Sequence, residues 1–347
     1  MNIQEGLAKV VIGESLDLSE MADVMRQLMS GDATDAQIGG LLIGLRMKGE
    51  TIEEIAGAAQ VMREMATPVK VSGEHLVDVV GTGGDGANLF NVSTASSFVA
   101  AAGGARVAKH GNRGVSSSSG ASELLEHLGV PLDLDPEQVA RSINEVGMGF
   151  MFAPAHHSAM RHAIGPRREL GMRTLFNVLG PMTNPAHVNR KVIGVYSPDL
   201  CEPMAKALKV LGLEHVMVVH SDDGLDEISI AAGTQVSELR DGSVSSYHIT
   251  PEEFLLERDS LEGLSVSGAA GSAEIIRGAL NGRDDPVLRK AAAMLALNGG
   301  AALYVSGVAA TLADGVELAE DLLASGQAAE KLQEFVDFTQ LMRGQVD

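Results

Sequence analysis

The chain has 347 residues, of which 45% are hydrophobic, so it can bury one large core or two unequal ones. Its formal charge of −20 excludes the broad positive surface of a nucleic-acid-binding protein. A single cysteine, Cys201, excludes an intramolecular disulfide and indicates a reducing compartment such as the cytoplasm, and the first ten residues lack the apolar segment of a signal peptide.

Residues 1–68 are predicted to be all-helical. Apolar residues repeat at the spacing of one helix face in three segments, two of which follow capping boxes that begin at Thr34 and Thr51. The first of these faces is formed by Met21, Val24, Met25 and Leu28. A domain this small cannot cover all its apolar faces alone, so we expect them to pack on later helices or on a second subunit. We predict a homodimer built on this region, with Met25 and Leu28 at its interface.

After Pro68, short apolar strands alternate with helices, which predicts an α/β fold with a mostly parallel central sheet flanked by helices. The expected parallel strands are LVDVV, ARVAK, GFMF, KVIGVY and HVMVVH. EISIA (227–231), TQVSELR (234–240) and SVSSYHI (243–249) are predicted to be edge strands, and residues 286–342 to be helical. The uncharged stretch 291–313 is long enough to span a membrane, but Asn298-Gly299-Gly300 and Ser306-Gly307 favour two buried helices that meet at a glycine turn, so no membrane segment is expected.

The stretch 154–185 interrupts this alternation. It is predicted to be helical and is cationic, with Arg161, Arg167, Arg168 and Arg173, and it ends in two closely spaced prolines that make a stiff connector. We expect it to return to the N-terminal helices, which gives a small helical domain (1–68 plus about 154–185) and a large α/β domain (69–153 plus 186–347) with a cleft between them. A positive patch in an acidic protein suits an anionic substrate, although a solvated helix face has the same composition.

The glycine turn Gly81-Thr82-Gly83-Gly84-Asp85 follows the first expected strand. Such a turn serves tight packing about as often as phosphate binding, and this one is neither a Walker A loop nor a dinucleotide fingerprint. Asn91-Val92-Ser93-Thr94 follows at the start of a helix, where backbone amides and hydroxyls converge. Lys109-His110-Gly111-Asn112-Arg113 adds two cations, although most such residues lie at solvated strand ends. Together the three segments predict a phosphate or pyrophosphate site.

The acidic run Asp222-Asp223-Gly224-Leu225-Asp226-Glu227 follows the strand HVMVVH. Most runs of this kind are acidic turns at a sheet edge. Asp226 and Glu227 nevertheless lie at the carboxyl end of a strand, where open α/β sheets bind ligands and where carboxylates can hold Mg²⁺ against a substrate phosphate. We interpret His156 and His157, which have no metal-ligand spacing, as packing or rim residues.

These motifs, with Arg168-Glu169-Leu170-Gly171 and Phe176-Asn177-Val178-Leu179-Gly180-Pro181, resemble in order the anthranilate phosphoribosyltransferase family over essentially the whole chain. The resemblance implies transfer of phosphoribose from phosphoribosyl pyrophosphate to the amine of anthranilate, with release of pyrophosphate, in tryptophan biosynthesis. It also implies a homodimer formed through the helical domain.

The resemblance implies a role for each motif. The residues implied to bind phosphoribosyl pyrophosphate are Gly81, Gly84, Asp85, Asn91, Val92, Ser93, Thr94, Lys109, His110, Gly111, Asn112, Arg113, Gly114, Val115, Ser116 and Ser117. Those implied to contact anthranilate are Gly81, Asn112 and Arg167. Two Mg²⁺ ions per subunit are implied at Ser93, Asp226 and Glu227. Leu89, Ala121 and Ser118 each lack a polar group that is frequent in the family, which bears on donor affinity more than on activity.

Two other functions share the implied fold. A pyrimidine nucleoside phosphorylase would use inorganic phosphate, and the paired Asp226 and Glu227 argue against it. A non-catalytic nucleic-acid-binding relative would need a basic surface and no metal carboxylates, and this chain has the reverse.

Displacement at the anomeric carbon passes through a cation-like sugar, so the reaction needs positioning and charge neutralisation on the leaving pyrophosphate rather than a covalent nucleophile.

Overall fold

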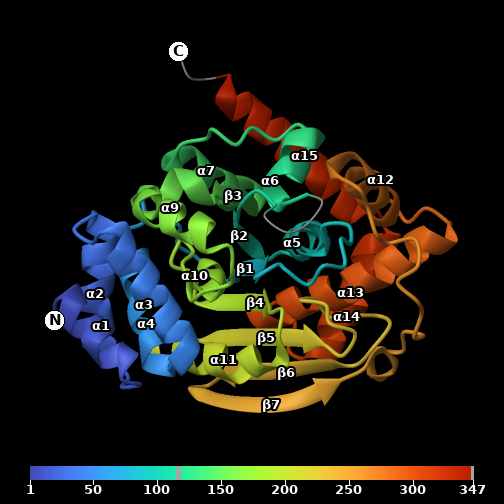
Figure 1. Cartoon of the computed structure of the whole chain (residues 1–347). Helices are drawn as coiled ribbons and strands as arrows, with labels where there is room; N and C mark the ends of the chain where they lie inside the picture. The colour runs from blue at the N-terminus through green and yellow to red at the C-terminus, as the bar shows by residue number, and fades with distance from the viewer. Residues whose placement is uncertain (115–118, 345–347) are drawn as a thin grey trace.

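The computed structural model describes residues 1–114 and 119–344, and its first four elements are short helices (Figure 1). They are α1 (Ile3–Val11), α2 (Leu18–Ser30), α3 (Asp35–Lys48) and α4 (Ile52–Glu64). Each begins at a capping box, in which the side chain before the helix and the third helical side chain accept each other's backbone amides. The boxes predicted at Thr34 and Thr51 are both present.

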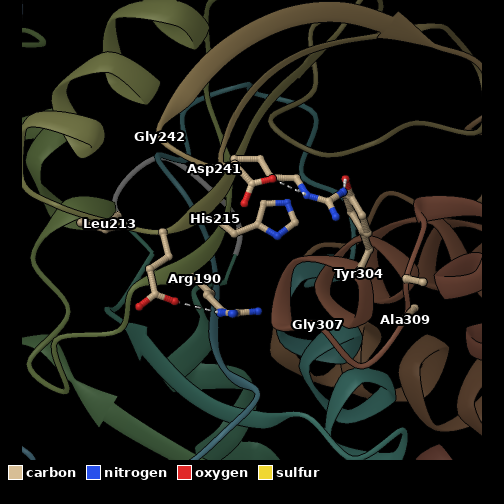
Figure 2. Close-up of a pocket in the computed structure, with 11 residues that line it drawn as sticks. Arg190, Leu213, His215, Asp241, Gly242, Tyr304, Gly307 and Ala309 are labelled. Carbon is tan, nitrogen blue, oxygen red and sulfur yellow. Dashed lines mark hydrogen bonds and ion pairs between the residues drawn. The ribbon is translucent and has the colours of Figure 1, made fainter.

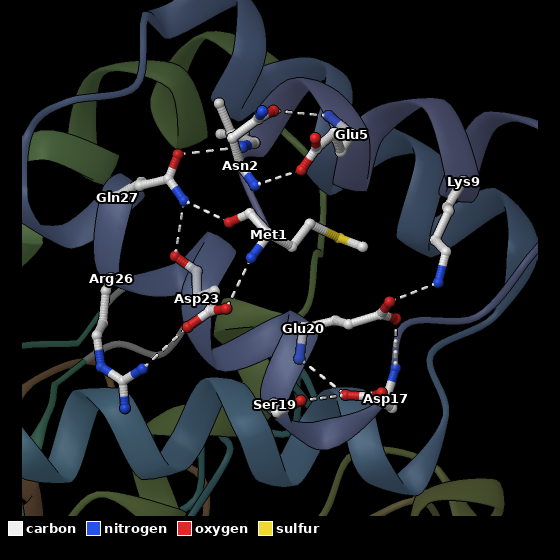
Figure 3. Close-up of polar contacts among 11 residues, drawn as sticks. Met1, Asn2, Glu5, Lys9, Asp17, Ser19, Glu20, Asp23, Arg26 and Gln27 are labelled. Carbon is white, nitrogen blue, oxygen red and sulfur yellow. Dashed lines mark hydrogen bonds and ion pairs between the residues drawn. The ribbon is translucent and has the colours of Figure 1, made fainter.

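Polar contacts fix α1 against α2 (Figure 3). The side-chain amide of Gln27 donates to the carbonyl of Met1 at 2.9 Å, and its oxygen accepts from the amide of Ile3 at 3.1 Å. Lys9 pairs with Glu20 at 2.6 Å. These contacts hold α1 where the side chain of Ile3 is buried in the core of the helical bundle.

The inserted stretch packs against this bundle. It forms α8 (Ala153–His156), η1 (Ser158–Met160), α9 (Arg161–Leu170), α10 (Phe176–Leu179) and η2 (Gly180–Met182). Helix α9 packs on α2 and α3, and α10 packs on α4. The placement of Met25 and Leu28 at a subunit interface is therefore wrong, because α1, α4 and α9 surround α2 and leave the two side chains 1% and 0% exposed within one chain.

The sheet has the strand order β3-β2-β1-β4-β5-β6-β7. The strands are β1 (Leu76–Gly81), β2 (Arg106–Gly111), β3 (Met148–Phe152), β4 (Arg190–Gly194), β5 (His215–Ser221), β6 (Thr234–Arg240) and β7 (Ser243–Ile249). The first five pair in parallel, with Gly81 beside Gly194, and the last two are antiparallel, which confirms the predicted mostly parallel sheet. The strand predicted at 227–231 is wrong, because the side-chain amide of Asn298 binds both the backbone N–H and the carbonyl of Ile228 in place of a neighbouring strand.

Helices cover both faces of the sheet (Figure 1). The remaining helices of the described chain are α5 (Val92–Ala102), α6 (Ala121–Leu128), α7 (Pro136–Val146), η3 (Pro198–Leu200), α11 (Cys201–Val210), η4 (Pro251–Phe254), α12 (Ala269–Leu280), α13 (Pro286–Ser306), α14 (Leu312–Ala324) and α15 (Gln327–Arg343). On one face α5 and α13 pack on β1, and the core there includes Val77, Val79 and Val192. On the other face α7 packs on β2 and β3, and α11 packs on β5 and β6 and joins the sheet to α4.

Helix α13 runs unbroken through Asn298-Gly299-Gly300, where the sequence predicts a break. The reason is close helix packing: a Cβ on Gly300 would collide with the backbone of Val316 in α14. The chain turns instead at Gly307, whose φ of +82° lies in the region that favours glycine. Among the described residues, no helix is long and apolar enough to cross a membrane.

Candidate active site

The glycine turn leaves β1 at the carboxyl edge of the sheet. Gly83 and Gly84 have φ values of +66° and +86°, where a residue with a Cβ would be strained. A Cβ on Gly81 would collide with the carboxylate of Asp226, and the amide of Gly83 donates to that carboxylate at 2.7 Å. The predicted glycine turn and the predicted acidic run therefore meet in space, in direct contact.

Asp226 and Glu227 lie at this edge because their loop crosses the end of β4. Gly194 has no room for a Cβ beside the carbonyl of Asp226. Burial, together with the negative charge of Asp85, raises the pKa of Asp226 to about 7. Burial and the charge of Asp226 also raise the pKa of Glu227, although Lys109 opposes the shift. Both carboxylates are disfavoured as anions, so a bound cation would stabilise them.

Lys109 extends from β2 toward the same place and is 1% exposed. Its ammonium donates to the carbonyl of Val79 at 2.6 Å and to the hydroxyl of Ser93 at 3.4 Å. Burial lowers the pKa of Lys109 to about 8, against the opposing effect of Asp78 and then of Glu227. The site therefore contains a buried amine between the start of α5 and the acidic loop.

The start of α5 brings further polar groups to this edge. Thr94 is fully buried, and its hydroxyl has no hydrogen-bond partner among the described residues. Val92 is buried in the core. The side chain of Asn91 does not cap the helix: it donates to the carbonyl of Ser119 at 3.1 Å and accepts from the hydroxyl of Ser272 at 2.8 Å. Asn91 thus ties the segment before α6 to α12.

The segment after Lys109 runs from the sheet to the surface. His110 is buried, and Gly111 is half-buried. Its exposed residues are Asn112, Arg113 and Gly114. Arg113 pairs with Glu126 at 3.2 Å, and the amide of Gly114 donates to Glu123 at 3.2 Å, so α6 holds this end of the segment. Of the predicted donor-binding residues, Val115, Ser116 and Ser117 lie outside the described residues, as does Ser118.

Arg167 projects from α9 toward α10. Its guanidinium lies 5.1 Å from the centre of the Phe176 ring, and burial lowers its pKa. No described acid forms an ion pair with Arg167, so its charge is free to bind a carboxylate. Arg168 is exposed, as its adjacent position on the helix predicts.

Arg173 links the inserted stretch to the glycine turn, a role that the sequence pattern did not indicate. Its guanidinium donates to the carbonyl of Gly84 and lies 4.0 Å over the ring of Tyr196. The backbone amide of Tyr196 in turn donates to the hydroxyl of Thr82 at 3.1 Å. The helical segment and the glycine turn are therefore joined directly.

His110 and His157 form a buried pair at the join between β2 and the inserted stretch. Their ring centres are 5.1 Å apart, and the Nε2 atom of each has no partner among the described residues. Burial, together with the neighbouring histidines, lowers the pKa of His110 to about 3 and that of His157 to about 4. Both rings are therefore neutral near pH 7, and their unpaired nitrogens can bind a water or a ligand.

The oxygen atoms at the site suit a hard cation. Residues 1–114 and 119–344 contain no cluster of three or more His, Cys, Asp or Glu arranged to hold a metal. The oxygen ligands that the chain offers at this edge include the carboxylates of Asp226 and Glu227 and the hydroxyl of Ser93. Mg²⁺ commonly binds one or two carboxylates, waters and substrate phosphates, so this incomplete set fits a magnesium ion shared with a phosphorylated substrate.

A cavity of about 580 Å³ lies at the opposite edge of the sheet (Figure 2). The amino ends of β4 and β5 and the end of α13 line it. Its charged groups are paired with protein groups: Arg190 donates to the carbonyl of Ser306 at 3.0 Å, and Arg240 donates to the hydroxyl of Tyr304 at 2.6 Å. None of the described residues of the predicted site lines this cavity.

Comparisons with known proteins agree over the full length of the chain. Residues 4–66 match the helical bundle domain of the glycosyl transferase family, and residues 73–329 match its a/b domain. The anthranilate phosphoribosyltransferases of Cellvibrio japonicus and Saccharophagus degradans are each 60% identical to the chain, in alignments that cover 99% and 98% of it and 100% of each relative.

Solved structures give the same result. The anthranilate phosphoribosyltransferase of Thermus thermophilus superposes with a TM-score of 0.91 at 44% identity, and the match covers 96% of this chain and 99% of that one. The enzyme of Saccharomyces cerevisiae, solved in complex with PRPP and Mg, superposes with a TM-score of 0.86 at 28% identity, covering 97% and 98%. The same yeast protein has also been solved with 4-fluoroanthranilate.

Proposed function

Because this chain belongs to the anthranilate phosphoribosyltransferase family, we infer that it transfers the phosphoribosyl group of phosphoribosyl pyrophosphate to the amine of anthranilate, a step of tryptophan biosynthesis. The products are N-(5-phosphoribosyl)anthranilate and pyrophosphate. The convergence of the glycine turn, Lys109 and Asp226 at one edge of the sheet carries this inference, because it combines a phosphate cradle, a cation and a metal-binding carboxylate. The nucleoside phosphorylase and nucleic-acid-binding alternatives have no such support.

The donor is proposed to lie along the carboxyl edge, on residues 81–94 and 109–117. The backbone of the glycine turn can approach a phosphate closely because Gly83 and Gly84 have no side chain. The unpaired hydroxyl of Thr94 and the ammonium of Lys109 add a donor and a positive charge. These groups favour the pyrophosphate end of the donor at the start of α5, where helix amides also point.

Two Mg²⁺ ions per subunit are proposed at Asp226, Glu227 and Ser93. The raised pKa values of the two carboxyls support this proposal, because a cation would relieve their mutual repulsion. The presence of Mg with PRPP in the yeast relative also supports it. When bound, Mg²⁺ neutralises the charge that develops on the leaving pyrophosphate.

Anthranilate is proposed to bind between the inserted stretch and the donor, with its carboxylate on Arg167 and with Asn112 and Gly81 near its ring. Arg167 is suited to this role because it is half-buried and has no acidic partner among the described residues. Burial strengthens a charge-assisted bond to a carboxylate.

The chemistry then depends on placement. The amine nitrogen of anthranilate forms a bond to the anomeric carbon as the bond from that carbon to the pyrophosphate oxygen breaks, and the nitrogen then loses a proton to water. An aromatic amine is unprotonated near pH 7, so a strong general base is not required. The groups of this chain hold the two substrates in line and stabilise the departing pyrophosphate, as Lys109 does with its positive charge.

We also propose that the protein is a cytoplasmic homodimer with the two-domain division given above. Val11, Ile12 and Met47 are 72%, 71% and 84% exposed, and they lie at the ends of α1 and α3, which pack together where Val10 meets Gly44. An exposed apolar group of this kind on the helical bundle suits a contact with a second copy. The buried Cys201, with its pKa raised by burial to about 12, suits a reducing compartment.

The test is an assay of anthranilate fluorescence. Adding phosphoribosyl pyrophosphate and Mg²⁺ to the protein and anthranilate should remove the fluorescence, and pyrophosphate should appear in equal amount. Omitting Mg²⁺ or the donor provides the control. Consumption of a pyrimidine nucleoside with inorganic phosphate, without loss of anthranilate, would contradict the proposed function.

A further inference from the structure

A fully buried ion pair lies within the sheet that carries the proposed site. Asp78 of β1 is 0% exposed and Lys191 of β4 is 1% exposed, and the two side chains pair at 3.0 Å. Burial alone would raise the pKa of Asp78, but Lys191 and Asn184 lower it, so the carboxyl is ionised. Burying an ion pair in an apolar sheet carries a desolvation penalty that the attraction between the two charges offsets only in part. The hydrogen bonds that the pair makes to other segments are therefore of interest.

The pair binds the connector that follows the inserted stretch. The ammonium of Lys191 also donates to the carbonyl of Pro181 at 3.1 Å. The side-chain amide of Asn184 donates to Asp78 at 2.8 Å and to the carbonyl of Ala108 at 2.8 Å. Side-chain hydrogen bonds therefore fasten the stiff proline connector to β1, β2 and β4.

The same ion pair contacts elements of both proposed substrate sites, which are called here the donor half-site (for phosphoribosyl pyrophosphate) and the acceptor half-site (for anthranilate). On the donor side, Asp78 accepts from the backbone amide of His110 at 3.2 Å, and His110 directly follows Lys109. On the acceptor side, η2, which contains Pro181, directly follows α10, whose first residue Phe176 lies under Arg167. The buried group of three side chains thus contacts the strand that contains Lys109. It also contacts the connector that directly follows α10, the helix whose Phe176 lies against Arg167.

We propose that Asp78, Lys191 and Asn184 are positioning residues that set the placement of the acceptor half-site relative to the donor half-site. The inference rests on the proposed function and deepens it. The three side chains touch no substrate. Their effect falls on the rate of transfer between bound substrates, because a small misplacement of two reactants slows their reaction more than it weakens the binding of either.

A purely structural role makes a different prediction. Buried ion pairs contribute little net stability, and a neutral pair of similar volume commonly folds as well. If the ion pair only fills space in the sheet, a neutral replacement of similar volume should keep both the fold and the turnover of the wild type. If it positions the connector, a neutral replacement folds but loses the bond from Lys191 to Pro181, and turnover falls.

The experiment uses the full-length protein with the double change Asp78→Asn and Lys191→Met, which removes both charges of the pair together. We expect cooperative unfolding like that of the wild type, nearly unchanged KM values for both substrates, and a kcat lower by about tenfold to a hundredfold. Asn184→Ala removes the bonds from Asn184 to Asp78 and to the carbonyl of Ala108 and leaves both the ion pair and the bond from Lys191 to Pro181. It should show the same pattern and serves if the double variant does not fold. Wild-type kcat in either folded variant, or a loss that appears in KM alone, would overturn the inference.

The matched control is a buried lysine–carboxylate pair in the helical bundle. Lys48 and Glu54 pair at 2.9 Å with 8% and 0% of their side chains exposed, far along the chain from the connector. Lys48→Met with Glu54→Gln should leave kcat unchanged. Wild-type protein is assayed alongside: if it does not consume anthranilate, the proposed function fails, whereas an active wild type with an equally active double variant contradicts only the positioning role.

Discussion

Asp226→Asn is expected to stabilise the metal-free protein while it abolishes turnover. Burial, and then the charge of Asp85, raises the pKa of Asp226 from 3.8 to about 7. Each pKa unit corresponds to about 1.36 kcal/mol, so ionised Asp226 lowers the free energy of unfolding by about 4 kcal/mol at pH 8. Because the pKa is raised on folding, this cost is absent below pH 3.8 and grows as the pH rises to about 7. Asparagine removes the charge and keeps an oxygen that can accept from the amide of Gly83.

Urea unfolding at pH 8 in a chelator checks the magnitude, and the fluorescence assay checks turnover. The variant should unfold at a higher urea concentration than the wild type, and Mg²⁺ should stabilise only the wild type. Asp199→Asn, a change of an exposed carboxyl after β4, is the control and should alter neither measurement. A variant no more stable than the wild type at pH 8 would refute the reasoning from burial, and normal turnover at limiting Mg²⁺ would refute the metal assignment.

Three further predictions use other parts of the structure. Arg167→Ala should raise the KM for anthranilate about tenfold to a hundredfold, because a charge-assisted bond of about 1.5–3 kcal/mol is lost, whereas Arg168→Ala, at an exposed position, should not; steady-state kinetics with equal effects of the two changes would contradict the assigned role. Folding lowers the pKa of His157 from 6.5 to about 4, so the unfolded chain binds a proton at this residue more readily than the folded chain. As the pH falls from 6.5 to 5, this difference should lower the free energy of unfolding of the wild type by about 2 kcal/mol. Urea unfolding of His157→Gln should show a loss of stability that is smaller by that amount. Leu28→Glu should unfold the protein because that side chain is fully buried, whereas Met47→Glu should keep the circular dichroism of the wild type and give monomers in light scattering; a folded Leu28→Glu protein or an unchanged Met47→Glu dimer would count against the respective placement.

The convergence of the site could be predicted from the sequence because it follows from topology. Once β1, β2 and β5 are recognised as parallel strands, their carboxyl ends must share one edge, and the glycine turn, Lys109 and Asp226 must approach one another. The capping boxes of the first helices could also be predicted, since each depends on residues three apart. Local chemistry and chain order were sufficient for these features.

Other features depend on partners far away in the chain. Gly300 weakens a helix locally, but its contact with Val316 of α14 makes a glycine the residue that fits there. Residues 227–231 have the composition of a strand, but Asn298 takes their backbone bonds. The spacing of the apolar residues of α2 shows which face is buried without showing what covers it. It is therefore compatible with a subunit contact at Leu28, whereas that side chain lies in the core.

The helical domain is built from segments that lie far apart in the sequence, and this has a consequence while the chain is being synthesised. Helices α1 to α4 are complete at Glu64, but α9, which packs on α2 and α3, ends at Leu170, and α11, which packs on α4, ends at Val210. At about 5–20 residues per second, a ribosome needs on the order of ten seconds to make the intervening chain. During that interval the parts of α2, α3 and α4 that α9 and α11 cover are exposed to chaperones or to other nascent chains. The first segment to be made therefore reaches its native packing only after the chain has been made as far as Val210.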